Sequence, residues 1–119
     1  MSKLNTLQKS RNSAFLKQAG RCFYCNFPMW LDHKDDFAKV HKLSSREADR
    51  FRCTAEHLLA RSESGKDTKD NIVAACLYCN QNRHRRKNPP TPNRYKEFIT
   101  RRIKKGKWIP SQLRSRISL

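Results

Sequence analysis

Acidic residues are scarce in this chain of 119 residues: 10 Asp and Glu stand against 27 Lys and Arg, which gives a formal net charge of +17. Long apolar runs are also missing, and none approaches the ~20 residues that a membrane-spanning helix needs. Residues 1–10 alternate between polar and apolar, so they contain no apolar core of a signal peptide. These absences argue against the membrane and secreted classes, and we expect a cytoplasmic protein.

The excess of positive charge calls for a partner that neutralises it, because self-repulsion destabilises a compact basic domain. Nucleic acid is the default partner, since each phosphate contacted by Lys or Arg releases a condensed counterion. A basic but inert surface, or a ribosome-associated protein that binds RNA without chemistry, would have the same composition. Charge alone does not choose among these alternatives.

The cysteines form a sharper pattern. Four of the five make two Cys-x-x-Cys pairs, Cys22 with Cys25 and Cys76 with Cys79. In a chain without an export signal, two such pairs indicate a four-cysteine zinc site. The alternative is a redox motif, but one pair would suffice for that and no βαβ pattern surrounds either pair. We interpret Cys53 as a small buried hydrophobic residue.

The length allows one compact domain over residues 1–119. We expect an N-terminal helix within residues 1–20, a core over 21–87 that carries an irregular insertion at 27–52, and a basic C-terminal helix and tail over 93–119. Residues 26–75 separate the two cysteine pairs, more than the 15–20 or so of a simple zinc ribbon.

Local patterns predict the elements of this domain. A helix over 5–19 would end at Gly20 and use Leu7, Phe15, Leu16 and Ala19 as its apolar face. Ser44 and Glu47 match a capping box that opens a helix over 44–51. The remaining predicted elements are strands at 53–59 and 72–75, a loop at 62–70, a helix opening within 80–87, and a helix over 93–105 whose other face is basic.

Polar residues surround the two predicted strands. The first strand carries Glu56 and His57, Asn71 precedes the second, and Asn80 and His84 follow the second cysteine pair. Phosphodiester cleavage needs a divalent metal against the phosphate and a base that deprotonates water. Neutral imidazole suits the base, and carboxylate and amide oxygens suit Mg²⁺.

The stretch Glu56-His57, Asn71 and Cys76-x-x-Cys79-Asn80 resembles the HNH endonucleases, whose core is a ββα-metal (His-Me) finger. The upstream Cys22-x-x-Cys25 is similar to the subgroup that adds a four-cysteine structural zinc. The loop holds one glycine, Gly65, where the family often has two. The resemblance covers residues 22–87, with unmatched sequence at 27–52.

The resemblance implies a role for each residue of the motif. His57 would be the general base, Glu56 and Asn80 would bind the catalytic Mg²⁺ or Mn²⁺, and Asn71 would hold the loop and orient His57. His84 stands where some members have a further metal-binding histidine. The four paired cysteines would hold Zn²⁺ and take no part in the chemistry.

Some residues keep two interpretations. Asn80 could instead cap the following helix, and His84 could contact phosphate. His33 and His41 carry no signal and are expected to be solvated. The residues expected to contact DNA are Arg61, Arg83, Arg85, Arg86, Lys87, Arg101, Arg102, Lys104 and Lys105.

The sequence therefore predicts an α+β fold with a small ββα-metal core and a four-cysteine zinc site, flanked by N- and C-terminal helices. The resemblance implies a metal-dependent endonuclease that hydrolyses DNA. Phosphate contacts from the basic residues position a protein without reading the sequence, so we expect weak base preference and steep salt dependence. The alternative is a non-catalytic zinc module that binds nucleic acid. A nucleobase deaminase is disfavoured, because the order is Glu-His and Ala75, not Pro, precedes Cys76. A homodimer is left open.

Overall fold

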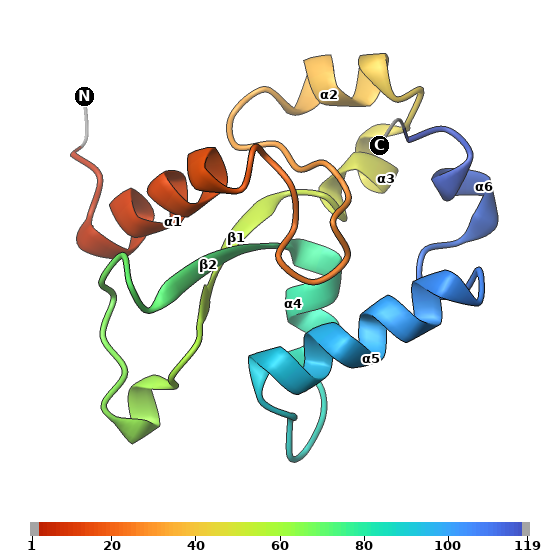
Figure 1. The fold of residues 1–119 in the computed structure, drawn as a ribbon. Helices are drawn as coiled ribbons and strands as arrows, with labels where there is room; N and C mark the ends of the chain where they lie inside the picture. Colours follow the sequence, from red (N-terminus) through yellow and green to blue (C-terminus); the bar gives the residue numbers. More distant parts are fainter. Residues whose placement is uncertain (1–2, 118–119) are drawn as a thin grey trace.

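The computed structural model describes residues 3–117, and these form an α+β fold with a two-stranded sheet (Figure 1). The predicted fold class is confirmed. In chain order, the elements are α1 (Thr6–Lys17), α2 (Lys34–Val40), α3 (Ser45–Asp49), β1 (Cys53–His57), the 3-10 turn η1 (Arg61–Glu63), β2 (Ile72–Cys76), α4 (Leu77–His84), α5 (Pro92–Lys104) and α6 (Ser111–Arg114).

The centre of the fold is an antiparallel hairpin followed directly by a helix. Strands β1 and β2 pair in a register that runs from Cys53 opposite Cys76 to His57 opposite Ile72. Helix α4 begins at the next residue, and Cys76 is its N-cap, with Sγ accepting a hydrogen bond from the Cys79 amide. This β1–β2–α4 unit is the predicted ββα core, and it brings the end of β1 and the end of α4 to one side of the molecule.

Helix α1 packs against both strands, as Figure 1 also shows. It begins with a capping box between Asn5 and Gln8 and ends before Gly20, which has a left-handed φ of 73°. The predicted apolar face is wrong in part: Leu16 is 77% exposed, and the buried positions are Ser10 and Ala14. Small residues four apart face the hairpin, and they let the helix approach it closely.

The insertion at 27–52 is more regular than expected. It contains α2, which the sequence did not predict, and α3, which opens at Ser44 with the predicted capping box. No side chain caps α2, but Asp35 and Asp36 lie in its first turn, where acidic groups interact favourably with the positive end of the helix dipole. The two helices pack together, so tertiary contact supports a helix that lacks a strong local start signal.

The expectation of a solvated His41 is also wrong. His41 is only 8% exposed, and its ring lies 4.5 Å from that of Phe37 between centroids. Burial lowers the pKa of His41, because the charged imidazolium is disfavoured away from water. The side chain is therefore part of the packed insertion.

Helix α5 begins one residue before the predicted start, with Pro92 in its first turn and Thr91 as N-cap. Tyr95 and Ile99 are fully buried on one face, and both belong to the single core cluster. The segment after α5 closes over this core through Ile109, Leu113 and Ile117. Within residues 3–117, every helix is too short or too polar to cross a membrane.

Candidate metal centres and active site

The four paired cysteines meet in one buried cage. Cys22 and Cys25 come from the loop after α1, and Cys76 and Cys79 from the junction of β2 with α4. Their sulfur atoms all lie within 4.8 Å of one another, and Cys25 Sγ is 3.9 Å from Cys76 Sγ. A tetrahedral Zn²⁺ with Zn–S bonds of about 2.3 Å has sulfur-to-sulfur edges of about 3.8 Å. The donor set and its dimensions therefore fit a structural zinc ion.

N–H groups from the surrounding chain donate hydrogen bonds to the cage sulfur atoms and so stabilise negative charge on them. The Tyr24 and Cys76 amides each donate to Cys22 Sγ at 3.3 Å, and the Trp108 indole donates to Cys79 Sγ at 3.3 Å. Burial alone would raise the pKa of Cys22, but hydrogen bonds from the other three thiols outweigh it and hold that pKa well below its usual value. The neighbouring thiols raise the pKa of Cys76 and burial raises that of Cys79, so a cation among the sulfur atoms would be needed to hold all four as thiolates.

Cys53 lies outside the cage although it pairs with Cys76 across the sheet. It is 4% exposed, as expected for a small buried hydrophobic residue. Burial raises the pKa of Cys53 to about 12, because a thiolate is disfavoured away from water. Cys53 therefore remains a neutral thiol.

A second cluster of polar groups forms at the far end of the hairpin. Glu56 and His57 end β1, and His84 ends α4. The Nε2 atom of His84 lies 3.0 Å from Glu56 Oε1. All three side chains line one open cavity of about 710 Å³, so the hairpin and α4 bring together three of the predicted site residues.

Glu56 is a carboxylate that the fold buries, with 3% of the residue exposed. Its Oε2 atom accepts a hydrogen bond from the Tyr24 hydroxyl at 3.0 Å and from Arg83 NH1 at 3.3 Å. Tyr24 lies between Cys22 and Cys25, so the loop that carries the first cysteine pair directly contacts this carboxylate. Burial, with the nearby charge of Glu56, raises the pKa of Tyr24 above its usual value and keeps the hydroxyl protonated.

Arg83 was expected to contact DNA, but it has a different place in the structure. It is 9% exposed, and its Nε donates to the Pro90 carbonyl while NH1 faces Glu56. An Arg beside a buried carboxylate compensates its charge. Arg83 is thus an internal partner of Glu56 and is not available on the surface for phosphate.

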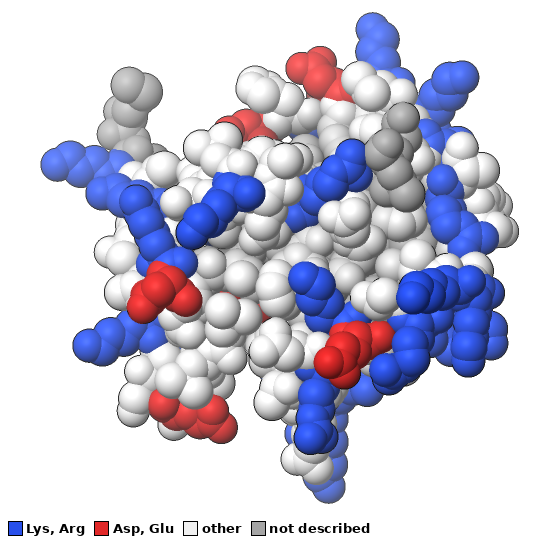
Figure 2. Space-filling model, viewed as in Figure 1, with Lys and Arg blue, Asp and Glu red and all other residues white. Residues whose placement is uncertain are grey.

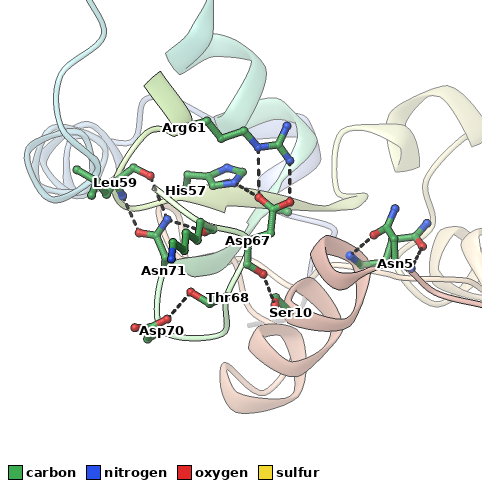
Figure 3. Close-up of polar contacts among 12 residues, drawn as sticks. Asn5, Ser10, His57, Leu59, Arg61, Asp67, Thr68, Asp70 and Asn71 are labelled. Carbon is green, nitrogen blue, oxygen red and sulfur yellow. Dashed lines mark hydrogen bonds and ion pairs between the residues drawn. The ribbon is translucent and has the colours of Figure 1, made fainter. Parts of the chain in front are cut away.

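Asn71 braces the loop between the strands (Figure 3). Its Oδ1 accepts from the Leu59 amide at 2.8 Å, and its Nδ2 donates to the carbonyls of Leu59 and Lys66. Gly65 lies inside this loop, where an added Cβ would come within 1.8 Å of the Leu59 carbonyl oxygen. Ser64 adopts a left-handed φ of 71°, a conformation that favours glycine. Asn71 and Gly65 together hold the loop tightly closed.

Asn80 is not the cap of α4, which is Cys76. Its Nδ2 donates to Thr54 Oγ1 at 2.9 Å and to the Ala55 carbonyl at 3.2 Å, both on β1. The alternative interpretation of Asn80 as N-cap is therefore wrong. The side chain instead ties α4 to the strand that carries Glu56.

Asp67 contacts His57, and sequence reasoning missed it. His57 Nε2 lies 2.8 Å from Asp67 Oδ1, and Arg61 also pairs with this carboxylate (Figure 3). Arg61, expected to contact DNA, thus forms an ion pair with the loop, although its side chain is 62% exposed. The only signal in the sequence was an acid four residues before Asn71, within a polar loop that contains several charges.

The other basic residues expected to contact DNA lie at or near the surface. Arg85, Arg86 and Lys87 are exposed after α4, as are Arg101, Lys104 and Lys105 near the end of α5, whereas Arg102 is half-buried. Figure 2 shows basic side chains gathered where the C-terminal half of α5 lies in Figure 1. The guanidinium of Arg86 lies over the Phe98 ring, 4.7 Å from its centroid.

Comparison with known proteins agrees with this geometry. The family model described as HNH endonuclease matches residues 44–86, which span α3, both strands, the loop and α4. The first cysteine pair and helices α1 and α5 lie outside the match. Neither the search of curated proteins nor that of solved structures found a match.

Proposed function

We propose that this chain, whose residues 44–86 carry the HNH endonuclease pattern, is a metal-dependent nuclease that hydrolyses phosphodiester bonds of DNA. One observation carries the proposal. A buried carboxylate, Glu56, and two imidazoles, His57 and His84, line a single open cavity at the end of a ββα unit. A carboxylate and a histidine that bind a metal ion, together with a second histidine that acts as a base, supply the groups that metal-assisted hydrolysis uses.

In this proposal His57 is the general base. Its side chain is 18% exposed, so it reaches the cavity while its Nε2 edge is held by Asp67. A water molecule that attacks phosphorus would give its proton to the imidazole as the P–O3′ bond breaks. The expected products carry 5′-phosphate and 3′-hydroxyl ends.

Glu56 and His84 are the proposed ligands of a catalytic Mg²⁺ or Mn²⁺. They already touch each other, and carboxylate oxygens are preferred ligands of these cations. Asn80, which the resemblance already implies as a ligand, would contribute its amide oxygen, because it lies four residues before His84 on the same face of α4. A cation bound there would neutralise charge on the phosphate and on the leaving oxygen. Tyr24 and Arg83 hold the Glu56 carboxylate in place from the other side.

The proposed function is tested by cleavage of supercoiled plasmid with added Mg²⁺ or Mn²⁺. His57→Ala should reduce cleavage by about 100-fold or more, the range that a general base contributes. The no-metal control omits the added cation and avoids a chelator, because a chelator would also attack the cysteine cage.

His33→Ala is the matched control for this experiment. His33 is exposed at the start of α2, and its side chain makes no capping hydrogen bond. This variant should cleave like the parent, and both variants should retain the same zinc content. If His57→Ala cleaves as well as His33→Ala, the catalytic proposal is wrong and a non-catalytic nucleic-acid-binding module takes its place.

We also propose that the basic end of α5 binds the DNA backbone. Replacing both Arg101 and Lys105 by alanine should reduce the slope of log affinity against log salt by about 2, roughly 1 for each phosphate that the variant no longer neutralises. The pair Lys39→Ala and Arg46→Ala is the control, since it removes the same charge from the exposed surfaces of α2 and α3. Equal slopes for the two double variants would place the DNA elsewhere on the surface.

A further inference from the structure

The ring of His57 is held by a carboxylate from the loop between the strands. His57 Nε2 lies 2.8 Å from Asp67 Oδ1, although the two residues are ten positions apart. Their side chains are 18% and 33% exposed, so the contact is partly sheltered from water. Figure 3 shows the Nε2 edge of the imidazole turned toward this carboxylate.

Asp67 is itself fixed from two other directions. Arg61 donates from Nε to Oδ1 at 3.2 Å and from NH2 to Oδ2 at 3.1 Å. The hydroxyl of Ser10 on α1 donates to the Asp67 backbone carbonyl at 2.6 Å. Such a two-point contact sets the orientation of the carboxylate as well as its position. A group held this firmly can in turn fix the ring that it touches.

The charge state of Asp67 follows from these contacts. The hydrogen bond with His57, and then the Arg61 guanidinium, hold the pKa of the Asp67 carboxyl below its ordinary value. Asp67 is therefore ionised at neutral pH and can only accept hydrogen bonds. A neutral imidazole beside it must carry its proton on Nε2.

We propose that Asp67 is a positioning residue that holds His57 as the Nε2–H tautomer and leaves Nδ1 free to take a proton from water. This inference rests on the proposed function, because it gives His57 its role as general base. A histidine with the wrong tautomer has no lone pair toward the water, even when its ring is correctly placed. Asn71 has a separate task, since its side chain bonds the backbone at Leu59 and Lys66.

Asp67→Asn tests the proposal with little change in shape. The new amide can donate to Nε2, which would favour the Nδ1–H tautomer. We expect kcat to fall by about 100-fold or more, as when a general base is lost, with KM for DNA nearly unchanged.

Asp70→Asn is the matched control. Asp70 lies in the same loop, is exposed, and has Thr68 Oγ1 as its side-chain partner. The control removes the same charge from the same loop without touching His57, so it should cleave like the parent.

The tautomer can be read directly without DNA or an added divalent cation. Protein labelled with ¹⁵N-histidine gives separate signals for the two ring nitrogens, and His57→Ala assigns those of His57. At a pH where the histidines are neutral, the parent and Asp70→Asn should show protonated Nε2. Asp67→Asn should shift the proton toward Nδ1. A merely structural brace would not produce this change.

The two measurements separate two kinds of failure. If the parent cuts no DNA under any metal condition, the proposed nuclease function is overturned. If the His57 tautomer is the same in Asp67→Asn and in Asp70→Asn, the positioning role of Asp67 is overturned, whether or not DNA is cut.

Discussion

The cysteine cage and the Glu56–His84 cavity stand at opposite ends of the same hairpin and are built in opposite ways. Every cage cysteine is 4% exposed or less, whereas the His84 side chain is 53% exposed. A structural zinc site is closed by its four ligands, but a catalytic site must leave room for water and substrate. The closed cage is therefore suited to stabilising the fold, while the open cavity is suited to chemistry.

The two regions are best told apart by replacing one residue from each. Cys76→Ser should unfold the domain, because a structural zinc ion contributes about 10 kcal/mol or more to folding in small domains. His57→Ala should melt like the parent, since its half-buried ring ends a strand and is not part of the core cluster. Circular dichroism melts with zinc analysis compare the two variants. Equal melting temperatures for Cys76→Ser and the parent would show that the cage is dispensable.

Glu56→Gln should affect both stability and activity, because Glu56 belongs to the cavity but is buried like the cage. It leaves Arg83 without its opposite charge, and the two side chains are only 4% and 11% exposed. Removing one partner of a buried ion pair costs about 3–5 kcal/mol, and we expect the lower end because the Gln oxygen still accepts hydrogen bonds.

Denaturant unfolding and the plasmid assay measure these two effects. Glu63→Gln is the control, because Glu63 lies exposed on the rim of the same cavity. Parent-like values for Glu56→Gln in both assays would contradict its place in the proposed site.

Tyr24→Phe tests the link between the two regions. It removes only the Tyr24 hydroxyl, which donates a hydrogen bond to Glu56 Oε2 at 3.0 Å, and the ring stays packed. We expect a loss of about 1 kcal/mol in stability and at most about a 10-fold loss of cleavage. Tyr78→Phe, which removes a hydrogen bond to the Trp108 carbonyl, is the control. If both variants cleave equally well, the hydrogen bond from Tyr24 supports the fold but does not affect the role of Glu56 in cleavage.

Cys53→Ala should have the smallest effect, because this cysteine is buried but is not one of the four cage residues. Zinc content should stay at the parent value, and the loss of unfolding free energy should be about 1 kcal/mol. From pH 9 towards 12 the parent should lose stability relative to this variant. In that range the unfolded thiol ionises, while the folded thiol, with a pKa of about 12, does not. Loss of zinc in Cys53→Ala would contradict the assignment.

Local signals in the sequence predicted helices that begin at a side-chain cap or end at a glycine. The capping box at Ser44 and the glycine stop at Gly20 each depend on residues within a few positions of one another. The helix α2 was missed, because it lacks a side-chain cap and is supported by its packing against α3. The exposed Leu16 was misassigned for a related reason, since periodicity does not say which face of α1 meets the hairpin.

The residues of the candidate site also fall into two groups, those that short motifs predicted and those that the sequence did not indicate. Short motifs pointed to Glu56, His57 and Asn71, and to the four cysteines that prove to share one cage. Asp67 and Tyr24 carry no motif, because each acts through a contact with a residue far along the chain. The buried position of Arg83 was hidden for the same reason, since a run of basic residues does not indicate which one turns inward.

The amino-acid order alone defined the types of donor atom and their short spacings: thiols three apart, an acid beside a histidine, and caps at helix starts. Only the folded chain established which groups meet across long stretches of sequence, such as Tyr24 and Arg83 on Glu56, or Asp67 on His57. The reason is physical, because local spacing fixes the relative position of neighbours through backbone geometry. Distant side chains are brought together only when burial of the common core offsets the entropy of closing the loops between them.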